Sequence, residues 1–187
     1  MDYKKYYLNY VDSISKLLIN IDTNLIDASV KLIDNTLNNN NKIYIVGNGG
    51  SSSIASHVSV DFAKVAKVNC STFNNANLIT CFANDYGYEK WIEKAIDFYA
   101  DNKDILILIS SSGKSPNMIN ACKAAKNNKM SKIITLTGHN KNNPLSKLGD
   151  INLWVDSKAY NFVENMHQIW LLTIVDLIIG KREYLPS

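Results

Sequence analysis

The stretch KIYIVGNGGSSS at residues 42–53 decides the fold, because an apolar strand runs at once into a glycine-rich turn and then into a helical segment. A second stretch, ILILISSSGKSP at residues 105–116, repeats this order of strand, loop and helix. Isoleucine or leucine at every position of 105–109 predicts a strand buried on both faces, as in parallel sheets. The two stretches together predict an α/β protein with helices covering a parallel sheet.

Working outward from these two stretches, the rest of the chain alternates in the same way. Further strands are predicted over residues 68–73, 133–136 and 151–155, and helices over about 51–68, 86–99, 116–128 and 161–179. Strands that alternate with helices predict a parallel sheet with right-handed crossovers and three layers. No repeat or linker divides the chain, so residues 1–187 are expected to form one domain with its α/β core in 42–187.

One or two further helices are predicted before the first strand, because apolar residues recur at helical spacing over residues 3–37. The asparagine run 38–41 is predicted to end them, since asparagine competes for backbone hydrogen bonds and favours turns. Apolar side chains are more numerous here than one buried stripe needs, so this region is expected to pack against another subunit.

The composition excludes several classes of protein. The chain has 187 residues, of which 46% are hydrophobic and 20% charged, as in soluble globular proteins and unlike disordered ones. Twenty basic residues against 17 acidic ones leave a net charge of only +3, and Arg182 is the one arginine. Nucleic-acid binding normally relies on clustered basic residues and on arginine, so no nucleic-acid partner is expected.

The cysteines and the apolar segments indicate the cellular compartment of the protein. Cys70, Cys81 and Cys122 are odd in number and form no C-x-x-C motif, which favours a reducing compartment. Residues 1–10 are polar and tyrosine-rich, unlike a signal peptide, and the apolar stretch 169–179 is too short to span a bilayer. A cytoplasmic protein without a membrane partner is expected.

The two loops that follow the central strands are the candidate binding elements. Glycines in 47–53 let backbone N–H groups approach an anion, and a helix amino terminus adds partial positive charge. The second loop, 110–115, places hydroxyls around Gly113 just before Pro116. Neither loop matches G-x-x-x-x-G-K-[ST] or G-x-G-x-x-G, so no nucleotide cofactor is indicated. Turns and helix caps alone would also explain these residues, but two such loops at one sheet edge favour a small phosphorylated metabolite.

Three motifs carry a resemblance to a known family. They are GNGGS at 47–51 with His57 beyond it, NDYGYE at 84–89, and SSSGKSP at 110–116. These motifs resemble the phosphoheptose isomerase branch of the SIS (sugar isomerase) family, and the correspondence extends over almost the whole chain. The resemblance implies a flavodoxin-like five-stranded sheet, a homotetramer, and interconversion of sedoheptulose 7-phosphate with an aldoheptose 7-phosphate.

The catalytic residues that the resemblance implies match only in part. A family histidine and glutamate correspond to His57 and Asp61, and a family glutamine and histidine from the last helix fall on Glu164 and Leu172. Leucine can neither bind a metal nor transfer a proton. The pair Glu164 and His167 has i, i+3 spacing and, with His57 and Asp61, would offer nitrogen and oxygen ligands for zinc or another divalent metal. A structural role is the alternative for His167.

The resemblance and the loop chemistry together assign roles to the candidate residues. Glu164 or Asp61 is the expected base, and a metal on His57 is expected to polarise the substrate carbonyl. The phosphate is expected on the second loop, namely on Ser110, Ser111, Ser112, Lys114 and Ser115. The sugar is expected on the first loop and the NDYGYE block, namely on Asn48, Gly49, Gly50, Ser51 and Asp85.

Three functions remain open from the sequence. The first is a phosphosugar isomerase that works through an enediol. The second is a non-catalytic phosphosugar sensor or protein-interaction scaffold, which the leucine at position 172 favours. The third is another enzyme on the same sheet, such as a phosphosugar lyase or an aminosugar-phosphate enzyme.

Overall fold

A parallel sheet of five strands forms the centre of the protein. The computed structural model describes residues 1–39 and 41–183, apart from the side chains of 36–38. The strands lie in the order β2-β1-β3-β4-β5, and every neighbouring pair is parallel. Their bounds are β1 Ile43–Gly47, β2 Cys70–Thr72, β3 Ile105–Ser110, β4 Lys132–Thr137 and β5 Ile151–Trp154. The predicted strands are therefore confirmed, with shifts of one or two residues at their ends.

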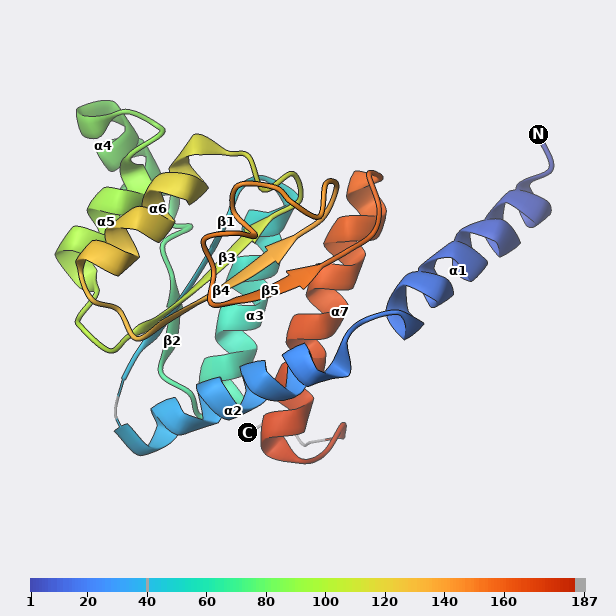
Figure 1. Ribbon diagram of the computed structural model, residues 1–187, viewed down its shortest axis with the longest axis horizontal. Helices are drawn as coiled ribbons and strands as arrows, with labels where there is room; N and C mark the ends of the chain where they lie inside the picture. Colours follow the sequence, from blue (N-terminus) through green and yellow to red (C-terminus); the bar gives the residue numbers. More distant parts are fainter. Residues whose placement is uncertain (40, 184–187) are drawn as a thin grey trace.

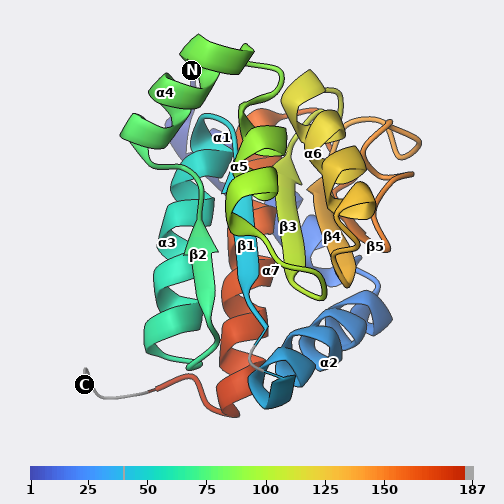
Figure 2. The same ribbon diagram turned by 90° about the vertical axis from the view of Figure 1, so that its left-hand side faces the viewer.

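Seven helices within the described residues surround this sheet. They are α1 Tyr3–Ile19, α2 Thr23–Asn39, α3 Gly50–Lys64, α4 Ala76–Tyr86, α5 Trp91–Tyr99, α6 Pro116–Asn127 and α7 Tyr160–Ile179. Figure 2 shows α5 and α6 in front of the sheet, with α3 and α7 behind it. The predicted three layers are confirmed.

Strict alternation along the central strands explains why both faces are covered. Ile43 and Ile45 of β1 point into the apolar cluster under α3 and α7, whereas Tyr44 and Val46 point into the cluster under α5 and α6. Successive side chains of a strand point to opposite faces, so an all-apolar strand needs a helical layer on each side.

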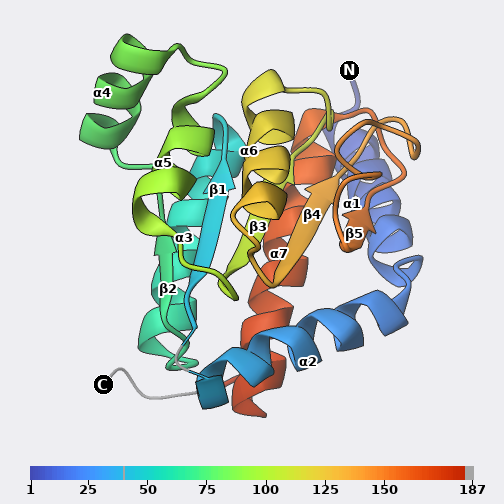
Figure 3. The same cartoon turned by 60° about the vertical axis from the view of Figure 1, so that its left-hand side comes forward.

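The segment between β2 and β3 differs from the prediction. One helix over 86–99 was expected, but α4 ends at Tyr86 and α5 begins at Trp91. Gly87 between them has φ +89°, a left-handed conformation that ends a helix and that glycine adopts readily. Asn75 begins α4, because its side chain accepts a hydrogen bond from the backbone N–H of Asn77. Figure 3 shows α4 beyond α5, at the end of the sheet toward which the strands point.

The amino-terminal segment forms two helices that differ in their packing. Helix α1 projects from the body of the molecule (Figure 1) and has no buried side chain. Helix α2 contributes Ile26 and Ile33 to the core and runs to Asn39, so the asparagine run enters the helix that it was predicted to end.

Helix α7 is the one described helix that is long and apolar enough to cross a membrane by length and composition. Its apolar character has another physical cause in this fold. Side chains such as Val163, Met166, Leu171 and Ile174 pack into the core cluster against α3 and the sheet. A helix that is apolar on most sides is typical of such a central position.

Candidate active site

The two predicted loops meet at the carboxyl edge of the sheet, where the strand order reverses. Strands β1 and β3 are neighbours, and Gly47 at the end of β1 pairs with Ile109 near the end of β3. The loops that follow them border a small cavity of about 120 Å³. Its lining consists of Asn48, Ser51, Ile109, Ser110, Ser111, Ser112, Ser115, Tyr160 and Glu164. A reversal point of this kind is where open α/β sheets bind ligands.

Three larger hollows among the described residues contain none of the predicted site residues. Two of them, of about 480 Å³ and 490 Å³, lie where α1 and α2 pass α7. The cavity at the sheet edge is therefore the candidate site, because it collects seven of the predicted side chains from two loops and α7.

The serine loop after β3 is held in a tight turn. Gly113 has φ +62°, its N–H donates to the Ser110 carbonyl (3.1 Å), and its own carbonyl accepts from the Leu145 N–H (3.0 Å). A Cβ at Gly113 would overlap the buried side chain of Asn143, so only glycine fits here. Ser115 precedes α6 without capping a backbone amide, so its hydroxyl is available to the cavity.

The glycine loop after β1 is braced by a side chain from beyond β2. The Asn74 side chain accepts from the Gly47 N–H (3.0 Å) and donates to the Gly47 carbonyl (2.8 Å), as a neighbouring strand would. Gly49 follows with φ +57°, and its carbonyl accepts from the N–H of Ser52 in the first turn of α3. This bracing fixes the point at which the chain leaves the sheet and enters the site.

A pair of amide side chains joins the two loops. Asn48 donates to Asn117 Oδ1 (3.0 Å), and Asn117 donates back to Asn48 Oδ1 (2.9 Å). The Tyr88 hydroxyl, from the segment between α4 and α5, also donates to Asn48 Oδ1 (3.2 Å). Asn117 is buried in the first turn of α6. Asn48 is therefore held from both sides at the mouth of the cavity.

Polar side chains also line the contact between α3 and α7. The carboxyl group of Glu164 rests over Gly50 in the first turn of α3, where a Cβ would overlap it. One turn further along α7, Gln168 Nε2 lies 3.4 Å from His57 Nδ1, and His57 Nε2 lies 3.4 Å from Asp61 Oδ2. We call these four side chains, Glu164, Gln168, His57 and Asp61, the α3–α7 seam. Only Glu164 among them borders the cavity.

His167 points away from the seam into the core. It is fully buried, and its Nε2 lies 3.2 Å from the Thr137 carbonyl, to which it donates in the neutral form. Burial lowers the pKa of His167 to about 4, so the ring is neutral at physiological pH. Its Nδ1 has no hydrogen-bond partner among the described residues. This geometry is the structural role given above as the alternative to ligation.

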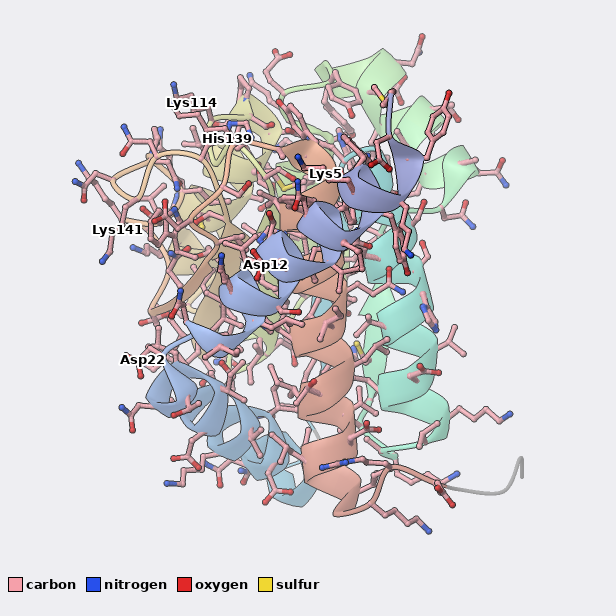
Figure 4. The ribbon with its side chains drawn as sticks, turned by 90° about the vertical axis from the view of Figure 1, so that its right-hand side faces the viewer. Lys5, Asp12, Asp22, Lys114, His139 and Lys141 are labelled. Carbon is pink, nitrogen blue, oxygen red and sulfur yellow. The ribbon has the colours of Figure 1, made fainter. Side chains whose placement is uncertain are left out.

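Two predicted contacts lie outside the cavity. Asp85 is exposed near the end of α4, where its carboxylate accepts from the Asn84 side chain (2.9 Å). Lys114 is exposed too, and Figure 4 shows its side chain at the outer edge of the molecule. Leu172, at the position of the family histidine, is partly buried against the apolar core.

The predicted metal ligands are not gathered into one set. Within the described residues, no three His, Cys, Asp or Glu side chains are placed to hold a metal ion. His57 already has Gln168 and Asp61 at its two ring nitrogens, Glu164 is at Gly50, and His167 faces Thr137. Zinc normally takes three or four protein ligands, so these residues do not fit a resident zinc site within one chain.

Comparison with known proteins identifies the family in agreement with this geometry. Residues 6–138 match the model of the SIS domain. The chain therefore belongs to the SIS domain family, a class of α/β proteins defined by this sheet and its edge loops.

The relatives place it in one branch of that family. It is 33% identical to the phosphoheptose isomerase of Aliarcobacter butzleri, over 96% of this chain and 97% of that protein. It is 31% identical to the phosphoheptose isomerase of Helicobacter pylori strain P12, over 94% of this chain and 93% of that protein. This is the phosphoheptose isomerase branch, as the motifs indicated.

Solved structures agree with the fold. A phosphoheptose isomerase from Francisella tularensis superposes with a TM-score of 0.87 at 25% identity, covering 96% of this chain and 98% of that one. The enzyme from Neisseria gonorrhoeae gives a TM-score of 0.85 at 25% identity, covering 94% and 98%. The predicted flavodoxin-like fold is confirmed.

Four residues at or near the site were missed by the sequence analysis. Tyr160 lines the cavity, Asn117 and Tyr88 hold Asn48, and Gln168 contacts His57. Asn117 follows Pro116 in the first turn of a helix that opens at a binding loop, a signal that could have drawn attention to it. Tyr88 lies in the NDYGYE block, but its partner Asn48 is 40 residues away; nothing in the local sequence marks Gln168, whose partner is 111 residues away.

Proposed function

We propose that this protein is an enzyme that interconverts a ketose phosphate and an aldose phosphate, with sedoheptulose 7-phosphate as the ketose. The observation that carries the proposal is the joint lining of one cavity by the serine loop and by Glu164. The first offers hydroxyls to a phosphate, and the second offers a carboxylate to a carbon-bound proton. Nearly full-length similarity to phosphoheptose isomerases supports the same reaction.

The phosphate group is assigned to the serine loop. Ser110, Ser111, Ser112 and Ser115 border the cavity at the amino terminus of α6. Hydroxyl donors and the partial positive charge of a helix amino terminus both favour a dianion. Lys114 adds positive charge from the outer edge of the same loop, and a long side chain of this kind can turn toward a bound anion.

Proton transfer is assigned to Glu164. The carboxylate takes the proton from the hydroxyl-bearing carbon beside the substrate carbonyl, and the electrons of that C–H bond move to the carbonyl oxygen and form an enediolate. The proton of the neighbouring hydroxyl passes to the former carbonyl oxygen, and Glu164 returns its own proton to the former carbonyl carbon, which yields the isomeric sugar without any other reactant. A positioned base typically contributes on the order of a hundred- to ten-thousandfold to such a step.

Asp61 and His57 are proposed to support this step rather than to perform it. They lie further along the α3–α7 seam and do not border the cavity. Gly49, Gly50, Ser51 and Asn48 remain the proposed contacts for the sugar, and Asp85 can contribute only if α4 moves toward the cavity. No step is derived through zinc, because the donor set does not fit it; we expect chelator-treated protein to retain its turnover.

The non-catalytic alternative rests on one observation, the leucine at position 172. A sensor needs the serine loop but no base. The non-catalytic alternative therefore predicts that the protein binds a sugar phosphate without converting it. The presence of an acidic side chain over Gly50, at the lining of the cavity, favours the enzyme.

We further propose a cytoplasmic homotetramer. Apolar side chains on α1 remain exposed in the single chain, including Tyr3, Tyr6, Tyr7, Leu8 and Val11. Such a surface is commonly covered by another subunit.

Two measurements test the proposed function. Sedoheptulose 7-phosphate is incubated with the protein, and formation of the aldose phosphate is followed by proton NMR; absence of turnover with this and other ketose phosphates contradicts the isomerase. Thermal shifts with sugar phosphates and with free sugars test the phosphate site, because a ligand that binds the native state raises Tm. We expect only the phosphates to raise Tm, and the double variant Ser112→Ala, Ser115→Ala to lose that response.

A further inference from the structure

The side chain of Asn48 is held in one orientation by three hydrogen bonds. Its oxygen accepts from Asn117 Nδ2 (2.9 Å) and from the Tyr88 hydroxyl (3.2 Å), and its nitrogen donates to Asn117 Oδ1 (3.0 Å). An amide oxygen has two lone pairs, and an amide nitrogen has two hydrogens. Both lone pairs and one hydrogen of Asn48 are thus occupied. The second N–H is the polar group that remains, on a side chain that lines the cavity.

Asn117 is well suited to fix this orientation. It is 2% exposed, and both ends of its amide face Asn48. The two reciprocal hydrogen bonds connect the end of β1 to the first turn of α6. Asn117 lies there two residues after Ser115 of the serine loop. A donor held in this way is set at a constant distance from the serine loop.

We propose that Asn117 and Tyr88 are positioning residues that fix Asn48 as a hydrogen-bond donor to the substrate carbonyl oxygen. The inference rests on the proposed isomerase function and deepens it. When Glu164 removes the carbon-bound proton, negative charge develops on that oxygen. A preorganised N–H stabilises such charge without a cation, and the loss of one donor of this kind typically costs roughly a hundred- to a thousandfold in kcat.

This assignment supplies the group that the reaction otherwise lacks. A metal on His57 was expected to polarise the carbonyl, but no three His, Cys, Asp or Glu side chains of the described residues are placed to hold a metal ion. Asn48 and Glu164 border the same cavity, so base and donor can act on one substrate. Because the free polar group of Asn48 is an N–H donor, we expect the site to prefer ligands that present an acceptor oxygen to Asn48.

Three variants and a control test the proposal. Asn48→Asp replaces the donor by an acceptor of the same size, and kcat is expected to fall at least about a hundredfold. Asn117→Asp removes the donation to Asn48 Oδ1 and is expected to lower kcat at least about tenfold, since the orienting partner is lost rather than the donor. Tyr88→Phe removes one hydroxyl from an exposed side chain and is expected to lower kcat a few-fold. The control, Asn127→Asp, makes the same change at an exposed position of α6.

A binding readout separates positioning from simple damage. Affinity for inorganic phosphate, measured by calorimetry, is expected to stay within about threefold of the wild type in every variant. Affinity for a phosphorylated hydroxamate, whose oxygen mimics the charged enediolate oxygen, is expected to fall in parallel with kcat.

The outcomes are distinct. A wild type without turnover on any ketose phosphate removes the proposed function, and this inference with it. An active wild type whose Asn48→Asp and Asn117→Asp variants keep their kcat overturns this inference alone. Equal losses of phosphate and hydroxamate affinity also overturn it, because Asn117 would then hold the loop rather than orient a donor. If Asn117→Asp does not fold, unchanged kcat and hydroxamate affinity in Tyr88→Phe and Asn48→Asp decide against it.

Discussion

Glu164 is the one side chain of the α3–α7 seam that borders the cavity. Its carboxyl group rests over Gly50, at the positive end of the α3 dipole, a position that favours a negative charge. The relatives' motif has glutamine there by resemblance, so this chain combines a gained carboxylate with the leucine at 172. The expected proton-transfer group of α7 is therefore at position 164 and not at position 172.

The first prediction concerns that carboxylate. Glu164→Gln keeps the size of the side chain and removes its charge and its ability to take a proton. We expect turnover to fall at least about a hundredfold, because the base is lost, while inorganic phosphate still binds. NMR of the sugar products and calorimetry with phosphate measure the two effects.

The matched control is Glu93→Gln in the first turn of α5, on the opposite face of the sheet. It is expected to behave as the wild type. Undiminished turnover of the Glu164→Gln variant would mean that another group moves the proton.

The second prediction concerns His167, which is buried and has its pKa lowered to about 4 by burial. An unfolded histidine titrates near 6.5, so between pH 6.5 and 4 the unfolded chain binds a proton that the native protein does not. Native stability therefore falls as pH falls through this range, by on the order of 3 kcal/mol in total.

His167→Gln keeps an amide N–H donor for the Thr137 carbonyl and removes the titration. Urea unfolding at several values between pH 4.5 and 7 is expected to show a smaller pH dependence for this variant than for the wild type. Identical pH profiles would show that His167 is protonated as readily in the native protein as in the unfolded chain.

At the scale of elements, the site depends on two loops that are held by side chains from elsewhere. Asn74 braces the end of β1, and Asn143 fills the space beside Gly113 after β3. Neither brace is adjacent in sequence to the loop that it holds. The loops therefore reach their binding geometry only when the whole sheet edge has formed.

The third prediction tests the serine loop. In Gly113→Ala, the added methyl group stands on a left-handed backbone and overlaps the buried Asn143 side chain. We therefore expect the free energy of unfolding to fall by roughly 1–3 kcal/mol and phosphate binding to weaken. Urea unfolding and phosphate calorimetry measure these effects.

Gly180→Ala at the end of α7 is the comparison, since its φ is +69° but the added methyl group meets open space. It is expected to cost about 1 kcal/mol and to leave phosphate binding unchanged. If the two variants lose equal stability and both bind phosphate normally, the close packing of Gly113 is not what shapes the loop.

At the scale of the whole molecule, α1 is the element with the least support from its own chain. It has no buried side chain, although its last turns pack partly against the core through Ile14, Leu17 and Leu18. The exposed apolar residues lie mostly on its first half. Further along the amino-terminal region, Leu25 and Ile26 pack within the chain instead.

The fourth prediction concerns this surface. We expect light scattering to give a mass several times the 21.0 kDa of one chain. Two charges placed on the exposed apolar face, Tyr7→Lys with Val11→Lys, are expected to lower that mass, because burying them between subunits is costly.

Asn9→Lys adds a charge at an exposed polar position of the same helix and is expected to leave the mass unchanged. A wild type that runs as a stable 21.0 kDa monomer at micromolar concentration would contradict the prediction.

The sheet, its layers and the two binding loops could be predicted from local stretches of sequence. Continuous apolar runs such as 105–109 leave a strand no exposed face, and the glycines and serines beyond them are local signals that need no distant partner. Helix α4 and the break at Gly87 were not predicted; no side chain of α4 is buried, although Leu78, Ile79 and Phe82 pack partly against the core. The serine loop and Glu164 were named from motifs, and the tertiary structure placed them on one cavity.

The roles of the remaining candidates depend on contacts that form in the folded chain. His57 and Asp61 share a helix face with Gly50, but the cavity ends before it reaches them, and the helix period alone says nothing of where a cavity ends. Asn117 and Tyr88 act through Asn48, which is 69 and 40 residues away. Contacts of that separation depend on strand order and helix packing, and these arise from the burial of the whole core rather than from any local stretch.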